Sequence, residues 1–166
     1  MPDKHDLNND KELKNKVMSE RNLQVNPTIK PQIINVGLEQ TPVIIIDDFA
    51  LDTSDIINDA CHYANFKADK TSYYPGVRAL LPRQYSIVLL QAIYQLICKV
   101  YRIPLTRNLV PQDTFYSLIT KQEAELDFLQ CLPHFDTSKH YHFAILHYLN
   151  DDDHGNTGLF RHQQTK

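Results

Sequence analysis

The sequence predicts one domain of the α+β class, in which helices precede a block of short strands. Apolar residues recur at helical spacing in two segments, 51–66 and 83–101, and both lie before Pro104. After Pro104 the chain divides into short apolar segments separated by polar turns, which is typical of strands. Because helices and strands are segregated along the chain, an α+β layout with a sheet-rich carboxyl half is favoured.

We expect a polar tail at 1–30 and an ordered domain at 31–166. Lys, Asp, Asn and Glu dominate the tail, which therefore has too little apolar surface to offset the entropy of ordering, apart from a transient helix over 11–21. Within the domain, the β-branched run Val43–Ile46 predicts a buried strand, because it is bounded by a proline and an aspartate.

Two helices and a loop follow this strand. In the first helix Thr53 or Ser54 could cap the free amide groups, and five residues share one apolar face: Ile56, Ile57, Ala60, Tyr63 and Ala64. The Pro75–Gly76 pair predicts a loop over 71–82. The second helix, from about Arg83 to Tyr101, is apolar over most of its circumference, so we expect it to lie against a sheet.

The carboxyl half is expected to be built from short strands. Polar or acidic turns separate four apolar segments, and "NDDDHGN" is the clearest of these turns. The predicted strands are 113–120, 125–132, 141–150 and 157–162.

Composition excludes several classes of function. A net charge of -3 gives no basic footprint for nucleic acid or for anionic lipid, and no apolar run is long enough to cross a membrane. The amino terminus lacks the apolar core of a secretion signal. The three cysteines are far apart and form neither a CxxC pair nor an even set, so we expect a cytoplasmic protein with reduced thiols.

Histidines are concentrated near the carboxyl end, where six of the eight fall in the last 33 residues. Two of the ligand-type side chains there, His134 and Asp136, are two positions apart. In an extended segment such residues point to the same side, so an imidazole and a carboxylate could reach one ion. The alternative is an ordinary turn in which Asp136 accepts hydrogen bonds from the amides of Thr137 and Ser138.

Several short motifs, in order along 31–166, extend this observation. They are "VIIIDDF" with Asp47, Asp48 and Phe49; "YYPGVRA"; "LPHFD" with His134 and Asp136; "AILHYLN" with Tyr148, Leu149 and Asn150; and "HGNTGLFRH" with Gly155, Asn156 and Thr157. This succession resembles the iron(II)/2-oxoglutarate oxygenases of the prolyl-4-hydroxylase type, and within them a set of bacterial proteins of unknown function. In the last motif Asn156 stands where the family has a second glycine.

The resemblance implies a double-stranded β-helix, or jelly-roll, with flanking amino-terminal helices. It implies that His134 and Asp136 ligate iron(II) and that 2-oxoglutarate is the co-substrate. Tyr116 matches a tyrosine that contacts the co-substrate in relatives, although a packed strand tyrosine is an alternative because the surrounding pattern is missing. Tyr74 and Arg78 would face substrate, or Arg78 is a surface cation. Neither the substrate, a small molecule or a peptide, nor the oligomeric state is indicated.

The third iron ligand is expected about 40 or more residues beyond Asp136, since four further strands of about 5–6 residues and connections of about 4 must intervene. Only 30 residues follow Asp136. We therefore expect a barrel that lacks its last strands and a chain with little or no activity. His162 is a weak candidate for the third ligand and Arg161 for the co-substrate anchor. His142 and His147 would face opposite sides of a strand, so one of them is expected to be buried and hydrogen-bonded.

Three functions follow from these observations. The first is a dioxygenase of the hydroxylase type. The second is a degenerate, non-catalytic jelly-roll module that binds a partner or a metal, which the missing ligand favours. A zinc hydrolase ranks last, because the HExxH spacing is absent.

Overall fold

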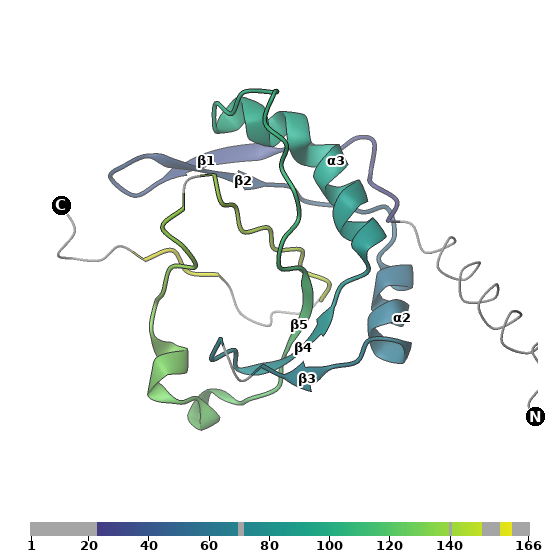
Figure 1. Ribbon diagram of the computed structural model, residues 1–166, viewed down its shortest axis with the longest axis vertical. Coiled ribbons are helices and arrows are strands. Elements are labelled where there is room, and N and C mark those ends of the chain that lie inside the picture. Colours follow the sequence, from purple (N-terminus) through teal and green to yellow (C-terminus); the bar gives the residue numbers. More distant parts are fainter. Residues whose placement is uncertain (1–22, 70–71, 140, 151–156, 161–166) are drawn as a thin grey trace, which may run out of the picture.

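The computed structural model describes residues 23–69, 72–139, 141–150 and 157–160 (Figure 1). These residues form a mixed α+β structure with two small antiparallel sheets. The elements are β1 (Gln32–Val36), β2 (Thr41–Ile45), α2 (Ser54–His62), β3 (Lys67–Ala68), β4 (Gly76–Leu80), α3 (Arg83–Val100), β5 (Phe115–Ile119) and the 3-10 turns η1 (Glu123–Glu125) and η2 (Phe128–Cys131). No helix in the described ranges has the length and apolar character of a membrane span.

The first sheet is a hairpin of β1 and β2, in which Ile33 pairs with Ile44. Positive φ angles at Gly37 (70°) and Gln40 (53°) close the connection, and the Gln40 amide donates to the carbonyl oxygen of Gly37 at 3.3 Å. β2 confirms the strand predicted at 43–46. Its central side chains are half-buried instead of fully buried, because a two-stranded sheet leaves much of its surface open.

The second sheet has the order β3–β4–β5 and places Arg78 at its centre, between Lys67 and Ser117. β5 confirms the strand predicted at 113–120. The loop predicted over 71–82 is wrong for its second half, because β5 provides a hydrogen-bonded partner for Gly76–Leu80. Gly76 is required at the start of β4, since a Cβ atom there would overlap the carbonyl oxygen of Leu118.

Both predicted helices are confirmed, as α2 and α3. The expected cap of α2 is wrong in its identity. Neither Thr53 nor Ser54 caps through its hydroxyl; instead the carboxylate of Asp52 accepts the Ser54 amide at 2.8 Å. Hydrogen bonds from the backbone and the side chain of Ser54 are the main reason that the pKa of Asp52 lies below its usual value.

The core lies where α3 packs with α2 and the sheets, as Figure 1 shows. Its buried apolar side chains come from six parts of the chain: Phe49, Ile56, Ala79, Tyr85, Leu89, Ile93, Ile97, Cys98, Ile103 and Tyr116. Apolar side chains from 23–29 also pack against this core, and the Leu51 amide donates to the carbonyl oxygen of Gln24 at 2.9 Å. Packing therefore begins before residue 31, while 1–22 lie outside the described residues.

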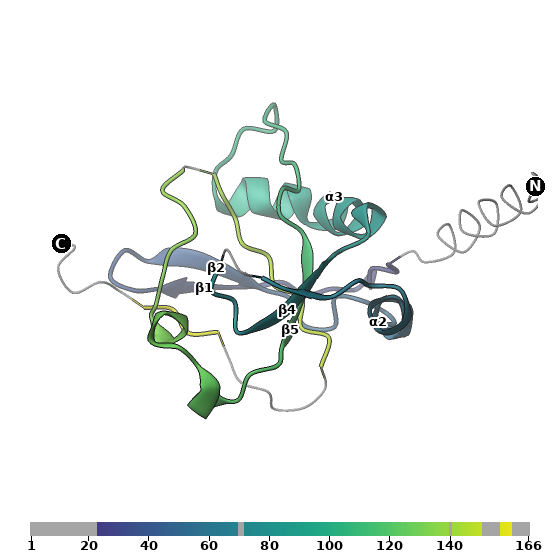
Figure 2. The same ribbon diagram turned by 60° about the horizontal axis from the view of Figure 1, so that its bottom comes forward.

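The strand predicted at 125–132 is wrong, because that stretch forms η1 and η2. Two capping boxes hold these turns: Gln122 with Glu125, and Asp127 with Gln130, exchange side-chain to backbone hydrogen bonds. η1 and η2, the light-green turns, lie on the side of β3, β4 and β5 away from α3 in Figures 1 and 2.

The strand predicted at 141–150 is not formed, and neither is one at 157–160. Phe143 and Leu149 still pack against the core, but the described chain provides no ladder partner for this segment. The described sheets do not close into a barrel. The rest of the acidic turn after Asn150, together with Arg161 and His162, lies outside the described residues.

Candidate functional site

His134 and Asp136 lie in the loop that follows η2. The His134 Nε2 atom is 3.7 Å from the Asp136 Oδ1 atom, so the two side chains converge, although the segment is a loop and not the extended strand on which the prediction was based. Their side chains are 81% and 61% exposed. The pair therefore stands at the surface, and the segment that carries it is a loop instead of the expected strand end.

The donor atoms of this pair suit iron(II), which accepts imidazole and carboxylate ligands in a facial triad. Adjacent ligands on an octahedral ion with bonds of about 2.1 Å are roughly 3.0 Å apart, so a small side-chain rotation would bring both atoms onto one ion. In the part of the chain that the structure describes, no third His, Cys, Asp or Glu joins them. The pair by itself therefore offers two of the three protein ligands that a facial triad requires.

Tyr116 lies in the core and away from this pair in the sequence and in its contacts. Its hydroxyl donates to the Asp59 Oδ2 atom at 2.9 Å and lies 3.4 Å from the Ile56 carbonyl oxygen, so it ties β5 to α2. Both Tyr116 and Asp59 are buried. These contacts are those of a packed strand tyrosine, which was the alternative to a co-substrate contact.

Arg78 is held by its neighbours on the second sheet. Its Nη1 atom lies 3.1 Å from the Asp69 Oδ2 atom and 3.1 Å from the Ser72 hydroxyl, which also hydrogen-bonds Asp69. Its guanidinium carbon lies 4.2 Å from the centre of the Tyr74 ring. Burial raises the pKa of the Tyr74 hydroxyl, and the nearby cation opposes that rise. Arg78 is therefore a half-buried, ion-paired residue of the sheet instead of a free surface cation.

His147 is the histidine of the 141–150 segment that faces inward, whereas His142 is exposed. The His147 Nδ1 atom hydrogen-bonds the Tyr85 hydroxyl, and the His147 ring meets Phe49 edge-on with 5.7 Å between ring centres. Burial lowers the pKa of His147 and raises the pKa of Tyr85 to about 12. His147 is thus hydrogen-bonded as predicted, but it is half-buried instead of buried, and no strand carries it.

Comparison with known proteins identifies a relationship over most of the chain. Residues 27–166 match the model of a family of unknown function, DUF6445. The chain belongs to the DUF6445 family. No curated protein and no solved structure matches it.

This DUF6445 chain has an apolar cavity of about 200 Å³ between β2, α3 and 143–147. Sequence reasoning missed it, because its walls are far apart in the sequence. The apolar circumference of the second helix was the available signal, since a helix apolar on all sides must be covered on all sides. His147 lines this cavity, and neither His134 nor Asp136 does.

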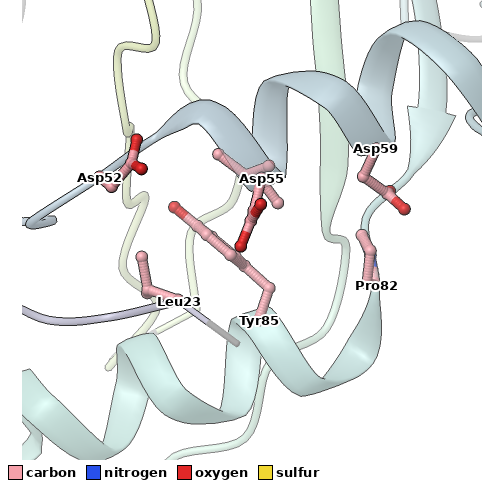
Figure 3. Close-up of a pocket in the computed structure, with 7 residues that line it drawn as sticks. Leu23, Asp52, Asp55, Asp59, Pro82 and Tyr85 are labelled. Atoms are coloured by element: carbon pink, nitrogen blue, oxygen red, sulfur yellow. The ribbon is translucent and has the colours of Figure 1, made fainter. Parts of the chain in front are cut away.

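A second cavity, of about 20 Å³, has room for roughly one water molecule. Figure 3 shows Asp52, Asp55 and Asp59 along α2 and the segment before it, with Tyr85 crossing from α3. The Tyr85 hydroxyl lies at the end of the cavity near Leu23, while Asp59 stands at the other end near Pro82. The described residues contain no group of three side chains that could hold a metal, so this acidic cavity is no candidate metal centre.

Proposed function

We propose that this DUF6445 chain is of the iron(II)/2-oxoglutarate-dependent oxygenase type, with His134 and Asp136 as two of its three iron ligands. The observation that carries the proposal is the convergence of the two side chains, whose donor atoms are 3.7 Å apart. An imidazole and a carboxylate are the ligand types of the facial triad. The motifs that resemble prolyl-4-hydroxylase-type enzymes add support from the sequence.

Bound iron(II), together with 2-oxoglutarate and O₂, would supply the oxidising chemistry for hydroxylation of a C–H bond. The part of His134 and Asp136 is to occupy one face of the ion and leave other positions open. His134 would bind the ion through a ring nitrogen that carries no proton.

We propose further that the two antiparallel sheets belong to a jelly-roll arrangement. The β1–β2 hairpin and the β3–β4–β5 sheet support this, since a jelly roll is built from antiparallel strands in two sheets. A cytoplasmic location is proposed with it. All three cysteines, Cys61, Cys98 and Cys131, are free thiols, which suits a reducing compartment.

A non-catalytic module that binds a metal or a partner is the second candidate. The specific observation in its favour is that the described residues offer two ligands and no third. The high exposure of both ligands also suits a binding site more than a water-excluding reaction site.

Anaerobic titration with iron(II), with and without 2-oxoglutarate, tests the proposal. For an oxygenase site we expect a weak visible charge-transfer band that requires both components. His134→Ala and Asp136→Ala should each abolish the band. His62→Ala is the matched control, because His62 is an exposed histidine whose ring nitrogen hydrogen-bonds the Asn58 carbonyl oxygen of its own helix and whose ring lies beside that of Tyr63.

The two candidates give different results in this titration. Iron binding without any response to 2-oxoglutarate supports the metal-binding module. A band that survives His134→Ala and Asp136→Ala would place the metal elsewhere and overturn the assignment of these ligands. Loss of the band in His62→Ala as well would show that the substitutions act through the fold.

A further inference from the structure

The apolar cavity beside α3 has three walls. β2 and the residues after it form one wall, the side of α3 that carries Ile93 and Ile97 forms the second, and the segment 143–147 forms the third. Most of its lining side chains are aliphatic or aromatic: Val43, Ile44, Ile46, Phe49, Leu89, Ile93, Leu96, Ile97, Tyr101, Phe143, Ala144, Ile145 and Leu146, with His147 at its margin.

No described lining residue carries a full charge at neutral pH when His147 is neutral. The Tyr101 hydroxyl donates to the Pro42 carbonyl oxygen at 2.9 Å, and His147 Nδ1 is hydrogen-bonded to Tyr85. Burial lowers the pKa of His147, which favours its neutral form. A charged ligand would therefore lose its hydration without gaining a counter-ion here.

The size of the cavity sets the size of an occupant. An apolar cavity of about 150 Å³ in a protein core can remain dry and bind benzene. The cavity in this chain measures about 200 Å³ and is open to solvent on the side of Ile145 and Leu146, so it can hold a benzene-sized molecule with room for one or two further heavy atoms.

We propose that this cavity is a binding site for a small, uncharged, apolar molecule of about the size of benzene or toluene. The segment 143–147 makes no sheet ladder in the described structure, so it can move aside without breaking strand hydrogen bonds. Leu146 on this segment is 63% exposed and also lines the cavity, which places it at the entrance. The site is separate from the proposed iron site and needs no metal.

The test is a titration of the full chain with benzene in the absence of metal and 2-oxoglutarate, monitored by ¹H–¹⁵N NMR spectra. We expect saturable shifts in the amide signals of 43–46, 93–97 and 143–147. Benzoate, which has the same ring and a negative charge, should bind at least tenfold more weakly. Non-saturating shifts with benzene, or equal affinity for benzoate, would overturn the proposal.

A large side chain placed inside the cavity, compared with the same side chain placed outside it, tests the location of the site. Ala144 lines the cavity, whereas Ala92 is an exposed residue of α3 outside it. Ala144→Trp should weaken benzene binding at least tenfold, and Ala92→Trp should change it less than twofold. The chain contains no tryptophan, so the fluorescence of each new ring reports its own surroundings. Emission at a shorter wavelength in Ala144→Trp than in Ala92→Trp would show that the ring fills the cavity.

The two variants also separate loss of the site from loss of the fold. Both should keep the circular dichroism of the parent chain, because neither alanine belongs to the buried core. Benzene binding that persists in a folded Ala144→Trp with short-wavelength emission would refute this location. Iron titration of Ala144→Trp should match the parent, so failure of the iron site and failure of the cavity proposal are distinguishable.

Discussion

Replacing Tyr116 with phenylalanine tests the link between β5 and α2. The substitution keeps the ring in the core and removes only the hydroxyl, which donates to Asp59 at 2.9 Å. Tyr116 is 6% exposed and Asp59 is 8% exposed, so bulk solvent does not reach this hydrogen bond, and the small cavity beside Asp59 has room for only about one water molecule. A hydrogen bond to a carboxylate contributes about 1.5–3 kcal/mol, and we expect the free energy of unfolding to fall by about 2 kcal/mol.

Urea denaturation measures this loss. With a slope of about 2 kcal/mol per molar urea, the midpoint should fall by roughly 1 M and the slope should not change. Tyr73→Phe is the control, because Tyr73 is an exposed tyrosine and its hydroxyl should contribute within about 0.5 kcal/mol.

A double-mutant cycle with Asp59→Asn decides whether the two side chains act together. If the hydrogen bond accounts for the loss, the coupling energy should exceed about 0.5 kcal/mol, as it does for residues in direct contact. A loss in Tyr116→Phe below about 0.5 kcal/mol, or additive effects in the cycle, would refute this reasoning. A selective loss of the response to 2-oxoglutarate with unchanged stability would instead favour the co-substrate role.

Three further predictions use the same urea assay. Burial lowers the pKa of His147 in the folded state, so the unfolded chain binds more protons below about pH 6.5. The free energy of unfolding should therefore fall as the pH is lowered from about 6.5, and it should fall less in His147→Gln. Gly76→Ala should cost at least about 2 kcal/mol, since the new Cβ overlaps the Leu118 carbonyl oxygen. Ile103→Ala should cost about 2–5 kcal/mol and Ile103→Val about 0.5–1.5, because Ile103 is buried. Unchanged midpoints in the alanine variants, or an equal pH slope in His147→Gln, would contradict them.

The helices were predictable from the sequence because their signal is local. In both helices the apolar residues recur at helical spacing, and most of them pack into the core. Tyr63, which was predicted on the apolar face of the first helix, is instead 67% exposed and follows the end of α2. The strand at 113–120 was predictable for a similar reason. β4 was not, because β5, the strand that pairs with Gly76–Leu80 along its whole length, lies beyond α3 in the sequence.

The sequence around 125–132 contains a local signal for helical turns. Its apolar residues between two polar turns predicted a strand, yet Asp127 and Gln130 have the spacing of a capping box, as do Gln122 and Glu125. For 141–150 the apolar pattern was correct in that Phe143 and Leu149 face the core. A strand also needs a partner, and a periodic pattern does not reveal whether one is available.

The candidate sites differ in how much local sequence determines them. His134 and Asp136 are two residues apart, so they lie close in any backbone conformation, and the loop brings their donor atoms to 3.7 Å. The pairing of His147 with Tyr85 joins positions 62 residues apart, and it needs the complete fold. The same holds for the cavity, whose three walls come from three separate elements.

An oxygenase needs its metal ligands and its substrate cavity in one place, whereas the two proposed sites lie in different parts of this chain. Hydroxylation needs metal ligands and also a space from which water is excluded. His134 and Asp136 offer the ligands but are largely exposed, whereas the cavity beside α3 is apolar but contains neither of them. Because the sites share no residue, iron titration and benzene titration test independent properties of the chain. Binding of benzene without an iron response would favour a ligand-binding module, and an iron band that requires 2-oxoglutarate would favour the oxygenase.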